Sequence, residues 1–191
     1  MRWFVFGILA YLFMAVQVSG VIDLPAGAFG AFGRPFVVLI LAVFVGLSAP
    51  PRATMIAWGT LGLLLDVTTV WPLAGSGGVT IIGPYALGCL AAGYTLLELR
   101  GMLFRQHPLT LGAMVVLCGV AVHLVVVGLF TIRHWYDPLA DWVAREQLLT
   151  RGAGLVYTAV LAVLLAWPLL KLAPAFGFQA SKSAVPWGRR R

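Results

Sequence analysis

The chain has 191 residues, of which 61% are hydrophobic and only 10% are charged, and its formal net charge is +7. Soluble domains carry about 25% charged residues, so this composition excludes a soluble domain. The length is that of a single domain. We therefore expect an integral membrane protein that lies almost wholly in or on the bilayer. Cys89 and Cys118 both fall inside apolar stretches, which predicts packing residues rather than a disulfide.

Six apolar segments are predicted to be transmembrane helices, because a span takes about 20 apolar residues, with a range of ~17–25. The first segment, residues 3–22, follows Arg2 and resembles a signal peptide. Its apolar core exceeds the ~7–15 residues of a cleaved signal, so we expect it to be retained as an anchor. The other five segments are expected near residues 35–50, 53–70, 79–97, 109–131 and 150–170.

The connections between these segments differ in character. Residues 23–34 are rich in Gly, Ala and Pro and predict an irregular connection, whereas the two prolines of residues 49–52 predict a tight turn. After the fifth segment, Asp137 and Pro138 are typical of an N-cap and first turn. They predict a short surface helix over residues 137–147. The charges of this loop nearly cancel, so we expect it to attract neither nucleic acid nor anionic lipid.

The charges of the loops predict the orientation of the chain, because cytoplasmic loops carry an excess of Lys and Arg. With six helices and a cytoplasmic N-terminus, nine cations lie inside and four outside, which accounts for all 13. Both termini are therefore expected in the cytoplasm. We divide the chain into a transmembrane helical domain, residues 1–173, and a basic tail, residues 174–191. The tail is expected to be disordered and to touch anionic membrane lipid.

One carboxylate, Asp66, interrupts the third segment. Gly59, Gly62 and Asp66 are spaced i, i+3 and i+7, so they share one helical face within about 60°. Small residues on such a face let another helix approach closely. Three interpretations of Asp66 stay open: a structural tether of the third helix to a loop or partner, a ligand or ion site, and an incidental residue at a wet helix end. We favour the tether.

The fifth segment contains a single histidine, His123, on a stripe with Gly112, Val116 and Gly119. A lone histidine in a membrane helix more often donates or accepts an interhelical hydrogen bond than acts in catalysis. The segment has no second His, and no Cys or Glu at helical spacing, to complete a metal site. We expect no metal and no cofactor.

An intramembrane hydrolase would need a serine nucleophile and a base. The candidate pair in this sequence is Ser76 and His123. Ala74 stands two residues before Ser76, so the glycine-framed serine motif of hydrolases is absent. The glycines around Ser76 predict a turn instead. No nucleotide-binding motif is present, and we expect a protein that is not an enzyme.

The order of features over residues 35–95 resembles a known family. A proline-led apolar helix from Pro35 is followed by a tight turn, then by residues 62–66, which read Gly-Leu-Leu-Leu-Asp, and then by Pro72-Leu73 and a glycine-rich turn. The next helix carries Tyr85, Gly88 and Gly93. This pattern resembles the rod shape-determining protein MreD family.

The resemblance implies an all-α membrane protein, a compact bundle of about six transmembrane helices similar to the substrate-binding subunits of energy-coupling-factor transporters. It implies a non-enzymatic scaffold of the elongation machinery in the bacterial cytoplasmic membrane. That scaffold binds the single-span protein MreC and, through it, MreB and the enzymes of peptidoglycan synthesis. The residues carried over are Gly62, Asp66 and the turn from Pro72 to Gly75, in structural or contact-forming roles.

Two other functions stay open. A small-molecule uptake subunit of the same fold would line a vitamin-like site with Asp66, Trp71 and the loop of residues 75–78. An intramembrane enzyme would act on lipid or peptide. A ligand site needs several convergent polar groups, and the outer half of the predicted bundle offers few beyond Asp66, Thr68, Thr69 and Ser76.

Overall fold

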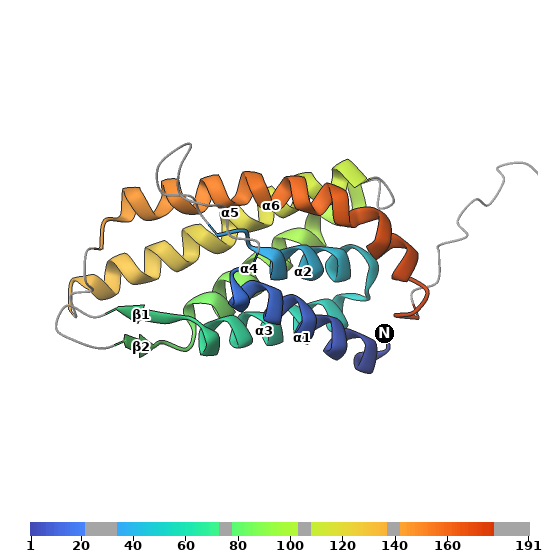
Figure 1. Cartoon of the computed structure of the whole chain (residues 1–191), viewed down its shortest axis with the longest axis horizontal. Helices are drawn as coiled ribbons and strands as arrows, with labels where there is room; N and C mark the ends of the chain where they lie inside the picture. Colours follow the sequence, from blue (N-terminus) through green and yellow to red (C-terminus); the bar gives the residue numbers. More distant parts are fainter. Residues whose placement is uncertain (22–33, 73–77, 103–107, 137–141, 178–191) are drawn as a thin grey trace, which may run out of the picture.

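The computed structural model describes residues 1–21, 34–72, 78–102, 108–136 and 142–177. Within these ranges the chain forms six α-helices, one short 3-10 helix and a two-stranded antiparallel hairpin (Figure 1). The elements in chain order are α1 (Trp3–Ser19), α2 (Val37–Ser48), α3 (Pro51–Thr68), β1 (Val70–Pro72), β2 (Gly78–Thr80), α4 (Pro84–Leu99), η1 (Arg100–Met102), α5 (Pro108–His134) and α6 (Ala144–Leu172). The prediction of an all-α protein with six helices is confirmed.

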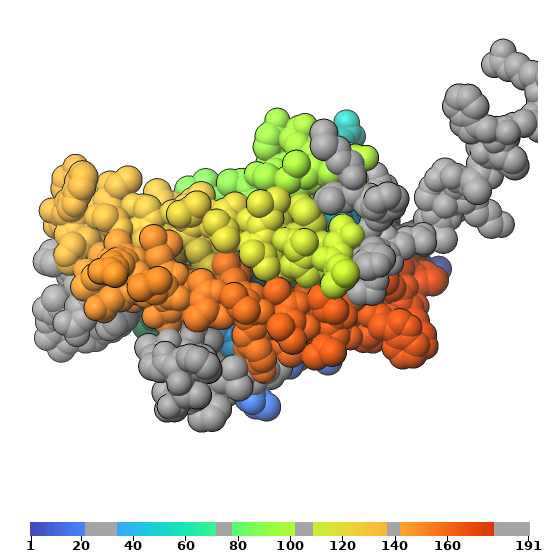
Figure 2. Space-filling model, turned by 90° about the horizontal axis from the view of Figure 1, so that it is seen from above, coloured from blue at the N-terminus to red at the C-terminus, as the bar shows by residue number. Residues whose placement is uncertain are grey.

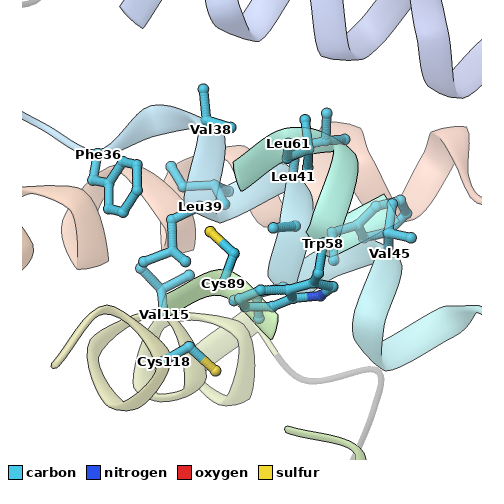
Figure 3. Packing of buried hydrophobic residues seen from close by; sticks show 14 of the residues in the cluster. Phe36, Val38, Leu39, Leu41, Val45, Trp58, Leu61, Cys89, Val115 and Cys118 are labelled. Atoms are coloured by element: carbon cyan, nitrogen blue, oxygen red, sulfur yellow. The ribbon is translucent and has the colours of Figure 1, made fainter. Parts of the chain in front are cut away.

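Helix α2 forms the centre of the bundle. All of its residues from Val37 to Leu47 are buried, and it contacts α1, α3, α4, α5 and α6. A helix that is apolar all round is buried on every side, and Figure 3 shows side chains of α3, α4 and α5 gathered about it. Its 12 residues make a helix about 18 Å long. That length is well short of the ~30 Å hydrocarbon core of a bilayer.

Helices α5 and α6 are the longest elements, and they cover one face of the molecule (Figure 2). Among the described residues, these two are long and apolar enough to cross a membrane, over Leu109–His134 and Ala144–Leu172. Helix α1, with 17 residues, is a shorter apolar helix. Small residues bring α5 close to its neighbours: a side chain at Gly112 would meet Val163 of α6, and one at Gly119 would meet Leu155.

The structure corrects several predicted boundaries. Helix α6 begins at Ala144 rather than near residue 150, so residues 144–147 form its first turn and not a separate surface helix. Residues 137–141, the rest of that predicted helix, lie outside the described residues. The turn after α3 contains a hairpin that the sequence did not predict, in which Trp71 pairs with Val79. Helix α4 begins five residues later than expected, at Pro84.

The two ends of the described chain meet at one end of the bundle (Figure 1). The backbone N–H of Arg2 donates a hydrogen bond to the carbonyl oxygen of Phe176 at 2.9 Å. Phe176 is fully buried, and its ring lies edge-on to that of Phe44 in α2, with 5.6 Å between centroids. At the same end, Arg100 donates a hydrogen bond to the carbonyl oxygen of Ala49 at 2.8 Å. These contacts close the end of the core.

The packing of Phe176 predicts a large loss of stability in Phe176→Ala. Removing a buried phenylalanine side chain leaves a cavity that costs about 3–5 kcal/mol of the free energy of unfolding. Leu172→Ala, which removes a side chain that is 40% exposed, is the matched control and should change stability little. Thermal unfolding of the purified full chain in detergent measures both, and equal effects of the two variants would contradict this account of the core.

Candidate functional site

The Asp66 carboxylate lies in the last turn of α3 and is only 1% exposed. Its two oxygens accept three backbone hydrogen bonds, from the N–H groups of Gly83 and Tyr85 at 2.8 Å and of Ala86 at 3.0 Å. These groups belong to the start of α4, where the first N–H groups have no partner inside the helix. The positive end of the helix dipole also favours a carboxylate there. Asp66 therefore caps α4 from a different helix.

The backbone around this cap explains why α4 needs an outside acceptor. Gly83, the residue before the helix, has φ +130°, a conformation that favours glycine. It has no side chain with which to cap the helix itself. Pro84 follows at the first helical position, where its missing N–H costs nothing. The sequence analysis did not single out Gly83, although a Gly-Pro pair before an apolar run is a usable signal of a helix start.

Gly62 of α3 lies against the backbone of α4. A Cβ atom placed there would lie 2.7 Å from the Cα of Ala86 and 2.9 Å from the carbonyl oxygen of Tyr85. Gly59, one turn earlier, is different, because its Cβ would lie 3.4 Å from the end of the Leu90 side chain. That is an ordinary contact. Of the two glycines on the predicted packing face, Gly62 is the one that meets backbone.

The predicted turn from Pro72 to Gly75 is described only at its start. Pro72 ends β1 and pairs with Gly78 of β2. Gly75 and Ser76 lie outside the described residues. Trp71, also in β1, is buried and packs on Phe130 of α5, with 4.1 Å between ring centroids.

His123 is buried at 8% exposure and lies beside two residues that are distant in sequence. Its ring stacks on that of Phe36, with centroids 5.3 Å apart. Its Nδ1 atom lies 3.5 Å from Nη1 of Arg151. Since an arginine keeps its protons, this contact is a hydrogen bond only where Nδ1 is unprotonated. Within the described ranges, no three His, Cys, Asp or Glu side chains are placed to hold a metal ion.

Arg151 is the functional candidate that the sequence analysis missed. Its Nη1 donates a hydrogen bond to the hydroxyl of Tyr85 at 2.9 Å, and its Nε contacts the Gln147 side-chain oxygen at 3.5 Å. The guanidinium also lies 5.3 Å from the centroid of Trp71, within range of a cation–π interaction. An arginine inside a long apolar helix is itself a signal of function. The sequence analysis counted it only among the four outer cations, at the start of the segment expected near residues 150–170.

Arg151, Tyr85, His123 and Gln147 line a pocket of about 360 Å³ where α1 and α3 end and α2 and α4 begin. Five of the six helices contribute to it, and most of the lining side chains are polar. Its cations are Arg34 and Arg151, and no acidic side chain among the described residues lines it. Phe36, the residue that precedes α2, forms part of the wall.

The start of α2, like that of α4, is capped by side chains of other helices. The N–H of Phe36 donates to Thr158 Oγ1 of α6 at 2.8 Å, and the N–H of Val37 donates to Gln17 Oε1 of α1 at 2.7 Å. Both of these caps are uncharged, whereas the cap of α4 is a carboxylate. The partial positive charge of the α2 N-terminus therefore adds to that of the two arginines at the pocket.

A second hollow, an apolar groove of about 930 Å³, runs between α1 and α3. Val18 and Thr68 line both the groove and the pocket, so the two spaces adjoin. Gly7 lies in the groove, and a side chain built on it would meet no atom within 4 Å. The groove is thus open beside α1.

The difference between Gly62 and Gly59 predicts different costs for the same substitution. Gly62→Ala should lower the free energy of unfolding by about 1–3 kcal/mol, because the added methyl collides with the backbone of α4. Gly59→Ala should be neutral or slightly stabilising, since alanine favours a helix over glycine. Thermal unfolding of both variants is the measurement. An unchanged free energy of unfolding in Gly62→Ala would mean that the close approach of α3 and α4 is not needed for stability.

The stability of Asp66 variants should depend on how many of the three amide N–H groups still have an acceptor. Asp66→Ala leaves three N–H groups without an acceptor, each at a cost of about 1–3 kcal/mol. Asp66→Asn keeps one oxygen but turns an NH₂ group toward an N–H donor, so its stability should fall between those of the wild type and the alanine variant. Thermal unfolding curves and abundance in the membrane measure the order of stability of the three chains. Equal stability of all three chains would contradict the capping role.

No family model, curated protein or solved structure matches this chain. The case for its function therefore depends on the geometry of the described residues and on the motif resemblance of residues 35–95.

Proposed function

We propose that the protein is a non-enzymatic scaffold of the bacterial cell-shape machinery, of the rod shape-determining MreD kind. The observation that carries this proposal is the use of Gly62 and Asp66. These two residues of the family-like motif join α3 to α4 through close packing and three amide hydrogen bonds. This use supports the proposal, because the resemblance implies a structural or contact-forming role for both residues.

In this proposal the chain crosses the cytoplasmic membrane several times, with both termini in the cytoplasm. Two observations support it: the nine-to-four bias of the predicted loop charges, and the hydrogen bond that brings Arg2 to Phe176. The bundle is proposed to be similar to the substrate-binding subunits of energy-coupling-factor transporters. Such a short buried helix as α2 is compatible with a membrane only where protein surrounds it.

The proposed partner is an MreC-like protein with a single membrane span, through which the scaffold would act on MreB and the enzymes of peptidoglycan synthesis. Helix–helix association in membranes depends on close packing of apolar surfaces. The described residues include large apolar side chains that are exposed on α1, α5 and α6 and could pack against a partner helix.

Co-expression with the MreC homologue of the same genome tests this proposal. We expect the tagged chain to retain that homologue through purification in mild detergent. Gly59→Ala should retain it equally, and Asp66→Ala should retain much less at equal membrane abundance, because α4 loses its cap. A homologue whose single span is replaced by an unrelated apolar helix is the control. Loss of the native homologue from the wild-type chain would contradict the scaffold proposal.

A second candidate function is a small-molecule uptake subunit, and the polar pocket favours it. Ligand pockets have volumes of about 300–1,000 Å³ and a few convergent polar groups, and the pocket of 360 Å³ with Tyr85, His123 and Arg151 meets this description. Asp66 is not among its lining residues, contrary to the site expected for that function. An uptake subunit would co-purify with an ATP-hydrolysing module rather than with an MreC homologue.

A further inference from the structure

We propose that the groove between α1 and α3 and the polar pocket at its end together bind one anionic lipid. The phosphate of the lipid would lie at Arg151, and one acyl chain would lie along the groove. This inference does not depend on the MreC-like partner. It follows from three properties of the described residues: the arrangement of Arg151, the charge of the pocket and the continuity of the pocket with the groove.

The guanidinium of Arg151 is held in place before any ligand arrives. Tyr85, His123 and Gln147 contact it through Nη1 and Nε, and it lies over the ring of Trp71. Within the described part of the chain, no residue accepts a hydrogen bond from Nη2, and no carboxylate pairs with the group. A planar, fixed guanidinium with a spare donor is well suited to phosphate oxygens.

The charge of the pocket favours an anion over a zwitterion. Arg151 lines it together with the start of α2, and Gln17, which caps α2, is neutral. The carboxylate of Asp66 is buried, does not line the pocket and already accepts three hydrogen bonds. A choline or ethanolamine headgroup would bring a second cation, for which the described lining offers no acidic partner.

The groove supplies the apolar half of the site. Its walls are side chains of α1 such as Phe6 and Met14, which face Ile56 and Leu64 of α3. It meets the pocket at Val18 and Thr68. A soluble anion would leave this groove unused, whereas an amphiphile occupies both spaces at once. The continuity of an apolar groove with a cationic polar end is therefore the reason to choose a lipid.

The test uses the full chain in nanodiscs of equimolar dioleoyl-phosphatidylglycerol and dioleoyl-phosphatidylcholine, followed by native mass spectrometry of the released protein. We expect the wild type to retain phosphatidylglycerol in preference to phosphatidylcholine. Arg151→Gln should lower that retention by about tenfold, the effect of losing one charge-assisted contact. Arg145→Gln is the control, since it removes the same charge from the exposed first turn of the same helix.

A second pair of variants tests the groove without touching Arg151. Gly7→Phe should fill the groove with little clash inside the protein and should lower retention of phosphatidylglycerol. Gly128→Phe is the control, because Gly128 also has no atom within 4 Å of an added Cβ but does not line the groove. Thermal unfolding without lipid confirms that each variant is folded.

Three outcomes would overturn the proposal. Equal retention of the two lipids by the wild type would mean that the site does not select an anion. Unchanged retention in Gly7→Phe would mean that the groove holds no acyl chain. Stabilisation of the wild type by millimolar inorganic phosphate, as large as that by phosphatidylglycerol and insensitive to Gly7→Phe, would assign the pocket to a free soluble anion instead.

Discussion

Two helices of this protein begin inside it, and a helix that begins inside must find acceptors for its first N–H groups. Buried N–H groups without partners cost too much to persist. The chain meets this constraint with side chains from other helices: Asp66 of α3 for α4, and Gln17 of α1 with Thr158 of α6 for α2. These caps link five helices at one level of the bundle, and the positions of the remaining contacts depend on them.

The polar pocket is a consequence of this arrangement. Because Asp66 fixes the first turn of α4, it also fixes Tyr85, whose hydroxyl accepts a hydrogen bond from Arg151. The start of α2 places Phe36, on whose ring His123 stacks. The residues that satisfy the backbone and the residues that line the pocket are thus neighbours along the same helices. A substitution that shifts a capping residue therefore also shifts the residues that line the pocket, and the reverse holds as well.

Sequence reasoning predicted the six helices and favoured a structural tether at Asp66, because hydropathy and a Gly-x-x-x-Asp spacing are local signals; it did not predict that the tether caps α4. It failed where the signal is not local. Arg151 meets Tyr85 and His123 across separations of 66 and 28 residues, and periodicity within a helix says nothing about which helices become neighbours. The start of α6 was misplaced because its first turn, from Ala144, is polar, and hydropathy alone begins the helix where apolar residues begin.

The position of Phe176 also has a consequence for the synthesis of the protein. Its ring covers Phe44 and its carbonyl accepts the N–H of Arg2, so the last described residues close a core whose first helices were made much earlier. Ribosomes add about 5–20 residues per second, so residue 176 follows residue 44 by roughly 7–26 s. During that interval the nascent chain lacks the ring contact between Phe44 and Phe176. A chain released before residue 176 lacks both the ring contact to Phe44 and the hydrogen bond to Arg2, so this end of its core stays unclosed.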